Sequence, residues 1–180
     1  MKAPILYTSR LLLKPLSMEH LTKDYVDWLN DEAVYRYLET GSGYNITRLK
    51  KYLSEVVKKD IYFWAIHIQE NNLHIGNVKI DPISQRHGWA EYGIMLGRKT
   101  EWGKGFAKEA TLKVIDFCFN ELNIRKITLG VVADNLSALT LYKKIGFVQE
   151  GLYKKQGYYQ SKYCDVIRMA LFNPNFNYSE

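Results

Sequence analysis

Residues 98–107 of this 180-residue chain read RKTEWGKGFA and connect a predicted strand to a predicted helix. This stretch follows Trp89–Gly97, an apolar segment typical of a strand. It leads into Gly105–Leu122, whose apolar residues recur at helical spacing, and a second apolar strand, Lys126–Ala133, comes next. A strand, a helix and a strand in this order predict a crossover between parallel strands.

The segments around this crossover predict an α+β fold. Further strands are expected around Leu11–Leu13 and at Ile61–Gln69, Leu73–Ile80, Phe147–Lys154 and Lys162–Phe172. Helices are expected from an N-cap at Ser17 to Leu29, near Ala33–Leu38, at Thr47–Lys58, and at Leu136–Ile145 after a cap at Asp134 or Asn135. Asp81-Pro82 is expected to end a strand. We therefore expect one domain over residues 1–180, with a mixed, twisted sheet of about seven strands and helices on both faces.

Composition narrows the functional classes. Hydrophobic residues make up 47% and charged residues 24%, as in ordinary globular domains. The net charge of +6 favours anionic partners, but the lysines form scattered pairs, so nucleic-acid binding is not expected. No apolar run is long enough for a membrane span or a signal peptide, which predicts a cytoplasmic protein without a membrane partner. Cys118 and Cys164 lack metal-site or disulfide-framework spacing, and no metal is expected.

The loop at 98–107 has the construction of a phosphate site. Gly103 and Gly105 allow a tight turn and close approach of the backbone to a ligand. The first turn of the following helix presents free N–H groups, which favour an anion, and Lys104 and Lys108 add positive charge. A P-loop is excluded because Gly105 follows Lys104, and a dinucleotide fingerprint is excluded because Lys108 replaces its third glycine.

A second block, DNLSALTLYKKIGF at residues 134–147, carries Asn, Ser, Tyr and Gly-Phe around a helix. Together with RLLLKPL at 10–16 and WGKGFAKEA at 102–110, it closely resembles the GCN5-related N-acetyltransferase (GNAT) superfamily. The resemblance covers almost the whole chain. It lies in the branch of ribosomal-protein N-terminal acetyltransferases and their small-molecule relatives. It implies a mostly antiparallel sheet and acetyl-CoA as cosubstrate.

The resemblance also implies roles for individual residues. Backbone groups of Met95–Gly97 would pair with the pantetheine arm, which Asn135 would also bind, and Tyr142 would protonate the departing thiolate. Trp102 stands where the family commonly has Arg or Gln, so backbone N–H groups are left to bind the pyrophosphate. The implied cofactor-binding set is Met95, Leu96, Gly97, Trp102, Gly103, Lys104, Gly105, Phe106, Ala107, Asn135 and Tyr142.

An amine must lose a proton before it attacks, because alkyl amines are charged near pH 7. Glu91 is the first candidate base, directly or through water, since alternation along its strand places it on one face with Gly93 and Met95. The same position equally fits a surface carboxylate paired with a cross-strand Lys or Arg. His87 and His67 are weaker candidates.

The sequence thus predicts direct transfer of acetyl from acetyl-CoA to a primary amine, by a monomer or homodimer. In similar proteins residues 17–58 and 147–172 form the acceptor cleft. The acceptor is a peptide or protein N-terminus or a small-molecule amine, or alternatively a nucleotide-linked amino sugar of surface-polysaccharide synthesis. The positive balance argues against polyamines, although Asp24, Asp27, Asp31 and Glu32 supply some acid. A non-catalytic acyl-CoA-binding module is the alternative of another class.

Overall fold

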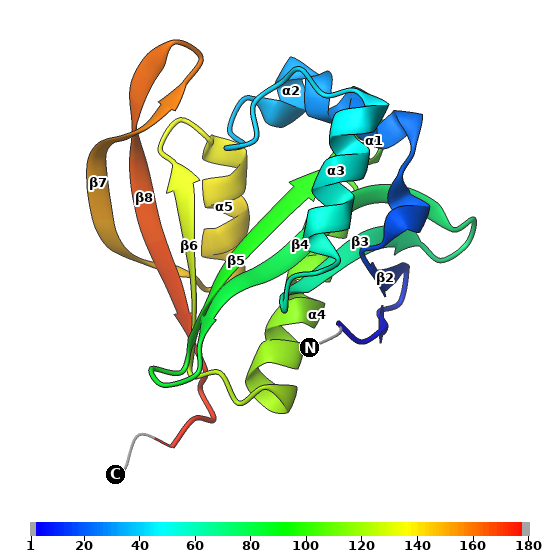
Figure 1. Cartoon of the computed structure of the whole chain (residues 1–180). Coiled ribbons are helices and arrows are strands. Elements are labelled where there is room, and N and C mark those ends of the chain that lie inside the picture. Colours follow the sequence, from blue (N-terminus) through cyan, green and yellow to red (C-terminus); the bar gives the residue numbers. More distant parts are fainter. Residues whose placement is uncertain (1–2, 178–180) are drawn as a thin grey trace. The chain divides into compact units, whose positions relative to one another are not determined.

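A computed structural model describes residues 3–177, and Figure 1 traces its elements. Eight strands are hydrogen-bonded in the order β1-β2-β3-β4-β5-β6-β8-β7. Among the pairs whose register is described, β5 and β6 are parallel, as the crossover predicts, and the others are antiparallel. The α+β class is confirmed. The sheet has one strand more than expected because Leu6–Tyr7 adds a short β1 before β2.

The chain forms two compact units, and β4, β5 and α4 pass through both. The first unit holds residues up to Ile80 and Gly93–Lys113. Its elements are β1 (Leu6–Tyr7), β2 (Leu11–Pro15), η1 (Met18–His20), α1 (Lys23–Asn30), α2 (Glu32–Tyr35), α3 (Ile46–Val56), β3 (Tyr62–Ile68), most of β4 (Leu73–Ser84), the end of β5 (Trp89–Leu96), η2 (Lys99–Glu101) and the start of α4 (Phe106–Asp116). Apolar faces of α1 and α3 meet in its core, around the buried Trp28, Leu49 and Leu53.

The single helix expected from Ser17 to Leu29 is wrong at its start. Ser17 caps only the 3₁₀ turn η1, and Thr22 caps α1 by accepting a bond from the Tyr25 N–H at 3.2 Å. Between them Leu21 has a ψ of 81°, which is not helical. Two capping side chains five residues apart divide the segment.

The second unit holds Asp81–Tyr92 and the residues from Val114 onward. After α4 the helix widens into a π turn, η3 (Phe117–Glu121), and then come β6 (Lys126–Val132), α5 (Leu136–Ile145), β7 (Val148–Tyr159) and β8 (Lys162–Phe172). The predicted bounds of α5 and β8 are confirmed, with Asn135 as the cap of α5. Gly146 ends α5 with a φ of +111°, a conformation that glycine adopts without strain.

Two strands run further than predicted. β4 continues through Asp81-Pro82 to Ser84, so the expected stop at Asp81 is wrong. A proline is tolerated in a strand wherever its missing N–H is not needed by the ladder. β7 extends to Tyr159 because register shifts at Gln149/Gly151 and Tyr153/Gly157 keep it paired with β8. None of the helices within residues 3–177 is long and apolar enough to cross a membrane.

Three histidine rings pack together in the first unit. The ring centroids of His20, His67 and His74 lie 5.0 to 5.3 Å apart. Tyr25 and Trp28 complete the surroundings of His74, with centroids at 5.8 and 4.9 Å. These contacts leave the ring of His74 little access to water, and its Nδ1 is buried without a hydrogen-bond partner.

The hydrogen bonds of His20 and His67 require neutral rings. His67 Nδ1 donates to the Asn72 carbonyl at 2.9 Å, since a carbonyl only accepts. His20 Nδ1 accepts from the Ser17 N–H at 3.0 Å, so its Nε2 carries the proton and donates to His67 Nε2 at 3.2 Å. Burial lowers the pKa of all three histidines, and that of His74 to about 3.

We predict that acid destabilises the fold through this cluster. An unfolded histidine titrates near pH 6.5, so unfolding takes up a proton below that pH while the folded His74 stays neutral down to about pH 3. The free energy of unfolding should fall from pH 6.5 toward pH 5, with His74 alone contributing about 1.4 kcal/mol per pH unit. Urea titrations of His74→Gln should show that slope reduced. The same substitution at the exposed His87 is the control, and an unchanged slope in His74→Gln would contradict the prediction.

Candidate active site

The loop after β5 is built on two left-handed glycines. Gly103 and Gly105 have φ values of +77° and +84°, on either side of the exposed Lys104. A Cβ at Gly103 would meet no atom within 4 Å, so this glycine serves the turn and lies in open space. The expected tight turn leading into a helix is confirmed, and the helix begins at Phe106, one residue later than predicted.

The turn leaves a run of backbone donors uncommitted. Within residues 3–177, the N–H groups from Gly103 to Lys108 make no hydrogen bond to the chain, and the first helical bond is from Glu109 N–H to the Gly105 carbonyl. Such donors at a helix N-terminus attract an anion, and the positive end of the helix dipole adds to the attraction. Lys104 is paired with Glu101 at 2.9 Å, whereas Lys108 has no ion-pair partner among the described residues.

The Trp102 side chain connects the loop to the end of β5 by one hydrogen bond. Its indole Nε1 donates to the Leu96 carbonyl at 2.9 Å, while the side chain stays 42% exposed. This bond spans η2 and ties the beginning of the cradle to the end of β5. Trp102 therefore stabilises the loop through a hydrogen bond to its backbone.

The residues expected to meet pantetheine lie at the end of β5. Met95 packs partly buried against the core of the first unit. Leu96 offers a carbonyl already shared with Trp102, and the Gly97 N–H donates to the Ile75 carbonyl at 2.9 Å. A Cβ at Gly97 would lie 2.1 Å from the indole ring of Trp28. Only glycine fits at this position, a packing constraint that the sequence did not indicate.

In the second unit, Asn135 and Tyr142 lie on α5. The Asn135 Oδ1 accepts from the Ala138 N–H at 3.3 Å and from Ser137 Oγ at 3.0 Å, which leaves its amide N–H groups for another partner. Tyr142 is 7% exposed and packs edge-on against Tyr92 and Phe147.

The phenol of Tyr142 is neutral and uncommitted. Burial raises its pKa to about 12, so the proton stays on the oxygen near neutral pH. Among residues 3–177 the hydroxyl has no hydrogen-bond partner. The hydroxyl is therefore free to donate to a ligand or to water.

Glu91 is held in an ion pair with Arg168. The two Arg168 nitrogens donate to Oε1 and Oε2 at 2.7 and 2.6 Å, and Thr128 donates to Oε2 at 2.5 Å. Glu91 is thus paired with a cross-strand Arg, as in the second interpretation of this residue from the sequence. Thr128 and Arg168 were missed, because the register that brings β8 next to β6 cannot be read from the sequence.

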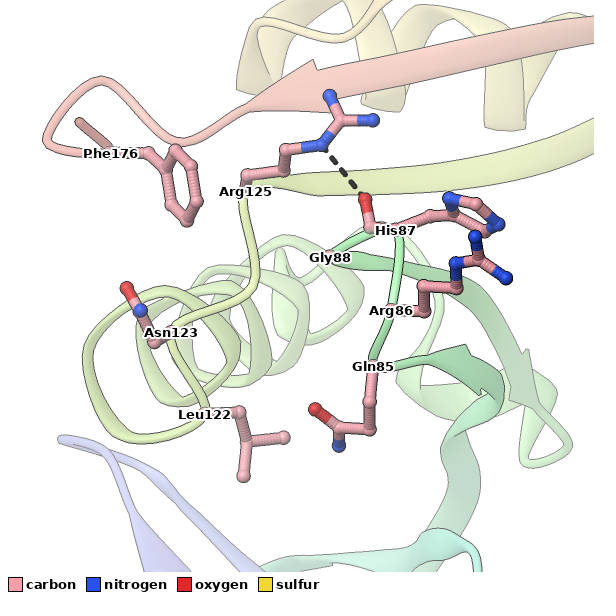
Figure 2. Close-up of a pocket in the computed structure, with 8 residues that line it drawn as sticks. All are labelled: Gln85, Arg86, His87, Gly88, Leu122, Asn123, Arg125 and Phe176. Atoms are coloured by element: carbon pink, nitrogen blue, oxygen red, sulfur yellow. Dashed lines mark hydrogen bonds between the residues drawn. The ribbon is translucent and has the colours of Figure 1, made fainter. Parts of the chain in front are cut away.

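The second unit also has a hollow of about 310 Å³ (Figure 2). It is lined by Gln85, Arg86, His87, Gly88, Leu122, Asn123, Arg125 and Phe176. Arg125 Nε donates to the His87 carbonyl across it, at 2.8 Å. Of the candidate residues only His87, a weaker candidate base, lines this hollow.

The family is settled by comparison with known proteins. The model of the acetyltransferase (GNAT) domain matches residues 10–148. This chain belongs to the GNAT acetyltransferases. It is therefore an enzyme that uses acetyl-CoA and transfers the acetyl group to an amine.

Individual relatives of this acetyltransferase cover nearly the whole chain. It is 30% identical to the spermidine N(1)-acetyltransferase of Escherichia coli K12 over 91% of this chain and 87% of that one. It is 28% identical to the uncharacterized N-acetyltransferase p20 of Bacillus licheniformis, over 95% and 97% of the two chains.

Solved structures agree with this assignment. The spermidine N-acetyltransferase of Vibrio cholerae, in complex with CoA and spermine, matches with a TM-score of 0.84, at 25% identity over 94% of this chain and 99% of that one. The ribosomal-protein-S5-alanine acetyltransferase of Vibrio fischeri has the same fold, with a TM-score of 0.84 at 18% identity over 97% and 99% of the two chains.

We predict that Gly97→Ala destabilises the protein by about 1–3 kcal/mol, because the new methyl group would overlap the Trp28 ring. Gly93→Ala, on β5, is the matched control, since its Cβ would have ordinary contacts at 3.6 Å with Lys79. The free energy of unfolding in urea checks both variants. Equal stability of the two variants would contradict the packing assigned to Gly97.

Proposed function

We propose that the enzyme transfers acetyl directly, without an acyl-enzyme, and that the loop after β5 binds the pyrophosphate of acetyl-CoA. The amine nitrogen attacks the acetyl carbonyl carbon, the C–S bond breaks, and CoA leaves as a thiolate. The observation that carries the cofactor assignment is the run of uncommitted N–H groups from Gly103 to Lys108. A nucleophilic cysteine is disfavoured because burial raises the pKa of Cys118 to about 12, and Cys164 is also buried.

The remaining cofactor contacts follow from the family resemblance. Met95, Leu96 and Gly97 are assigned to pantetheine through their backbone, with Leu96 and Gly97 able to offer carbonyl oxygens. Asn135 is assigned to the same arm through its amide N–H groups. Trp102 contributes by holding the loop in shape. The family match at residues 10–148 runs through both compact units, which supports a single domain.

Tyr142 is the proposed general acid. A departing thiolate needs a proton or a hydrogen-bond donor, and a neutral buried phenol without another partner supplies one. Glu91 remains the proposed base, acting through water. Its Oε1 accepts one described bond, from Arg168, and so keeps a lone pair for a water molecule.

For the acceptor, we propose a peptide or protein N-terminus or a small-molecule amine that is not a polyamine. Three of the four acidic residues named above are in ion pairs, Asp24 with Arg98, Asp27 with Lys23 and Asp31 with Lys99. A polycation would have to displace the Lys and Arg side chains from these carboxylates. The alternative is a nucleotide-linked amino sugar, favoured by the net charge of +6. We place the reaction in the cytoplasm, in line with the two unpaired cysteines, and propose a monomer or homodimer.

Thiol release from acetyl-CoA across an amine panel tests this function. The panel holds peptides with free N-termini, aminoglycosides, nucleotide-linked 4-amino sugars and spermidine. We expect turnover with one of the first three classes. Turnover with spermidine alone would overturn the acceptor proposal, and silence with retained CoA binding would favour a binding module.

We predict that Tyr142→Phe lowers kcat on the order of 100-fold, the usual contribution of a general acid. The dissociation constant for CoA should stay within about twofold, because only the hydroxyl is removed and it has no hydrogen-bond partner among residues 3–177. Steady-state rates with the best acceptor and calorimetry with CoA measure the two effects. Tyr7→Phe, at an exposed tyrosine, controls for the chemical change. Unchanged turnover in Tyr142→Phe would remove the assignment.

For Glu91 we predict two separable effects. Glu91→Gln should lower kcat/KM about 100-fold, as loss of a base does, and lower the free energy of unfolding by about 1.5–3 kcal/mol, because it weakens a charged hydrogen bond. Thr128→Val removes one bond to the same carboxylate but keeps its charge, so it should lower stability and leave kcat/KM nearly unchanged. Equal kcat/KM values for the two variants would reduce Glu91 to a structural role.

A further inference from the structure

A network of hydrogen bonds joins the segment before β2 to the first turn of α4, inside the first unit. Glu109 Oε1 accepts from Thr8 Oγ1 at 2.6 Å, from Ser9 Oγ at 3.1 Å and from the Arg10 N–H at 2.9 Å. Glu109 Oε2 accepts from Arg10 Nε at 2.7 Å. Three consecutive residues thus converge on one carboxylate a hundred positions later, whose side chain is only 16% exposed.

Arg10 extends the network to the loop itself. Its Nη1 donates to the Lys104 carbonyl at 3.0 Å, between the two left-handed glycines. Its guanidinium lies over the Phe106 ring, 4.5 Å from the centroid. One planar side chain therefore holds the loop at Lys104, the helix start at Phe106 and the first turn at Glu109. Lysine has no fork to reproduce these contacts.

The charge of Glu109 opposes the binding of an anion at the start of α4. A carboxylate in the first turn of α4 interacts favourably with the helix dipole, but it repels a diphosphate bound at the same N-terminus. Burial alone would raise the pKa of Glu109, yet the bonds from Thr8 and Arg10 outweigh it and keep the pKa below its usual value. The carboxylate is therefore ionised near pH 7, and Arg10 compensates its charge.

We propose that Arg10 is a positioning residue for the pyrophosphate of CoA, which fixes the Gly103–Lys108 donors and neutralises Glu109. This inference rests on the proposed role of the loop. Arg10 itself need not touch the cosubstrate. The network ties a cofactor loop in the middle of the chain to its first long strand, and the family motifs at 10–16 and 102–110 meet in it.

The experiment compares CoA with pantetheine, which lacks the diphosphate, in titrations followed by amide NMR shifts. Arg10→Ala should weaken CoA binding about 10-fold and leave pantetheine binding within about twofold. Arg10→Lys should fall between wild type and Arg10→Ala. Arg10→Ala/Glu109→Gln should bind CoA more tightly than Arg10→Ala, because the uncompensated carboxylate is gone. Arg86→Ala, at an exposed arginine outside the network, controls for the loss of one positive charge.

The possible results distinguish a failure of the role of Arg10 from a failure of the proposed function of the loop. Equal weakening of CoA and pantetheine in Arg10→Ala would mean that Arg10 only stabilises the fold, and would overturn the inference. Unchanged CoA affinity in Arg10→Ala would overturn it as well. If instead wild type binds CoA no more tightly than pantetheine, the loop does not bind the diphosphate and the proposed function itself fails. Should Arg10→Ala not fold, Arg10→Lys keeps the same comparison of CoA with pantetheine.

Discussion

Six consecutive backbone N–H groups, from Gly103 to Lys108, have no hydrogen-bond partner within residues 3–177, and the rest of the loop is organised around them. Unsatisfied donors are costly unless water or a ligand accepts from them. The helix dipole adds positive potential at the same place. Two glycines at positive φ create the turn, and the Trp102 indole and the Arg10 guanidinium hold its two ends. The local sequence is thus organised to keep an anion site open.

The acid proposed in the second unit, Tyr142, depends on the effect of burial on the pKa of a phenol. Burial beside Tyr92 and Phe147 raises the pKa of Tyr142, and within residues 3–177 its hydroxyl has no hydrogen-bond partner, which suits a proton donor. The Glu91 carboxylate also has a well-defined environment, in which Thr128 and Arg168 both donate hydrogen bonds to it. These bonds fix the carboxylate in the fold, and the same carboxylate is the proposed base. Its contribution to stability and its contribution to catalysis must therefore be measured separately.

The sequence predicted well the features that local patterns determine. The bounds of α5 and β8, the parallel crossover and the turn at Gly103-Lys104-Gly105 were all correct, because capping residues, glycines and apolar periodicity determine them. What failed or was missed depends on tertiary contacts. The division of the first helix at Thr22, the continuation of β4 past Pro82 and the tight fit of Gly97 on Trp28 require neighbours distant in sequence. The same is true of Arg168 beside Glu91 and of the histidine cluster.

The central claim is that the amides of Gly103–Lys108 bind the diphosphate. Hydrogen–deuterium exchange of these six amides, with and without saturating CoA, tests it most directly. The account predicts rapid exchange in the free protein, since the donors are unbonded, and at least about 10-fold slower exchange with CoA but not with pantetheine. Exchange that stays rapid in this loop while CoA is bound would contradict the account and place the diphosphate elsewhere.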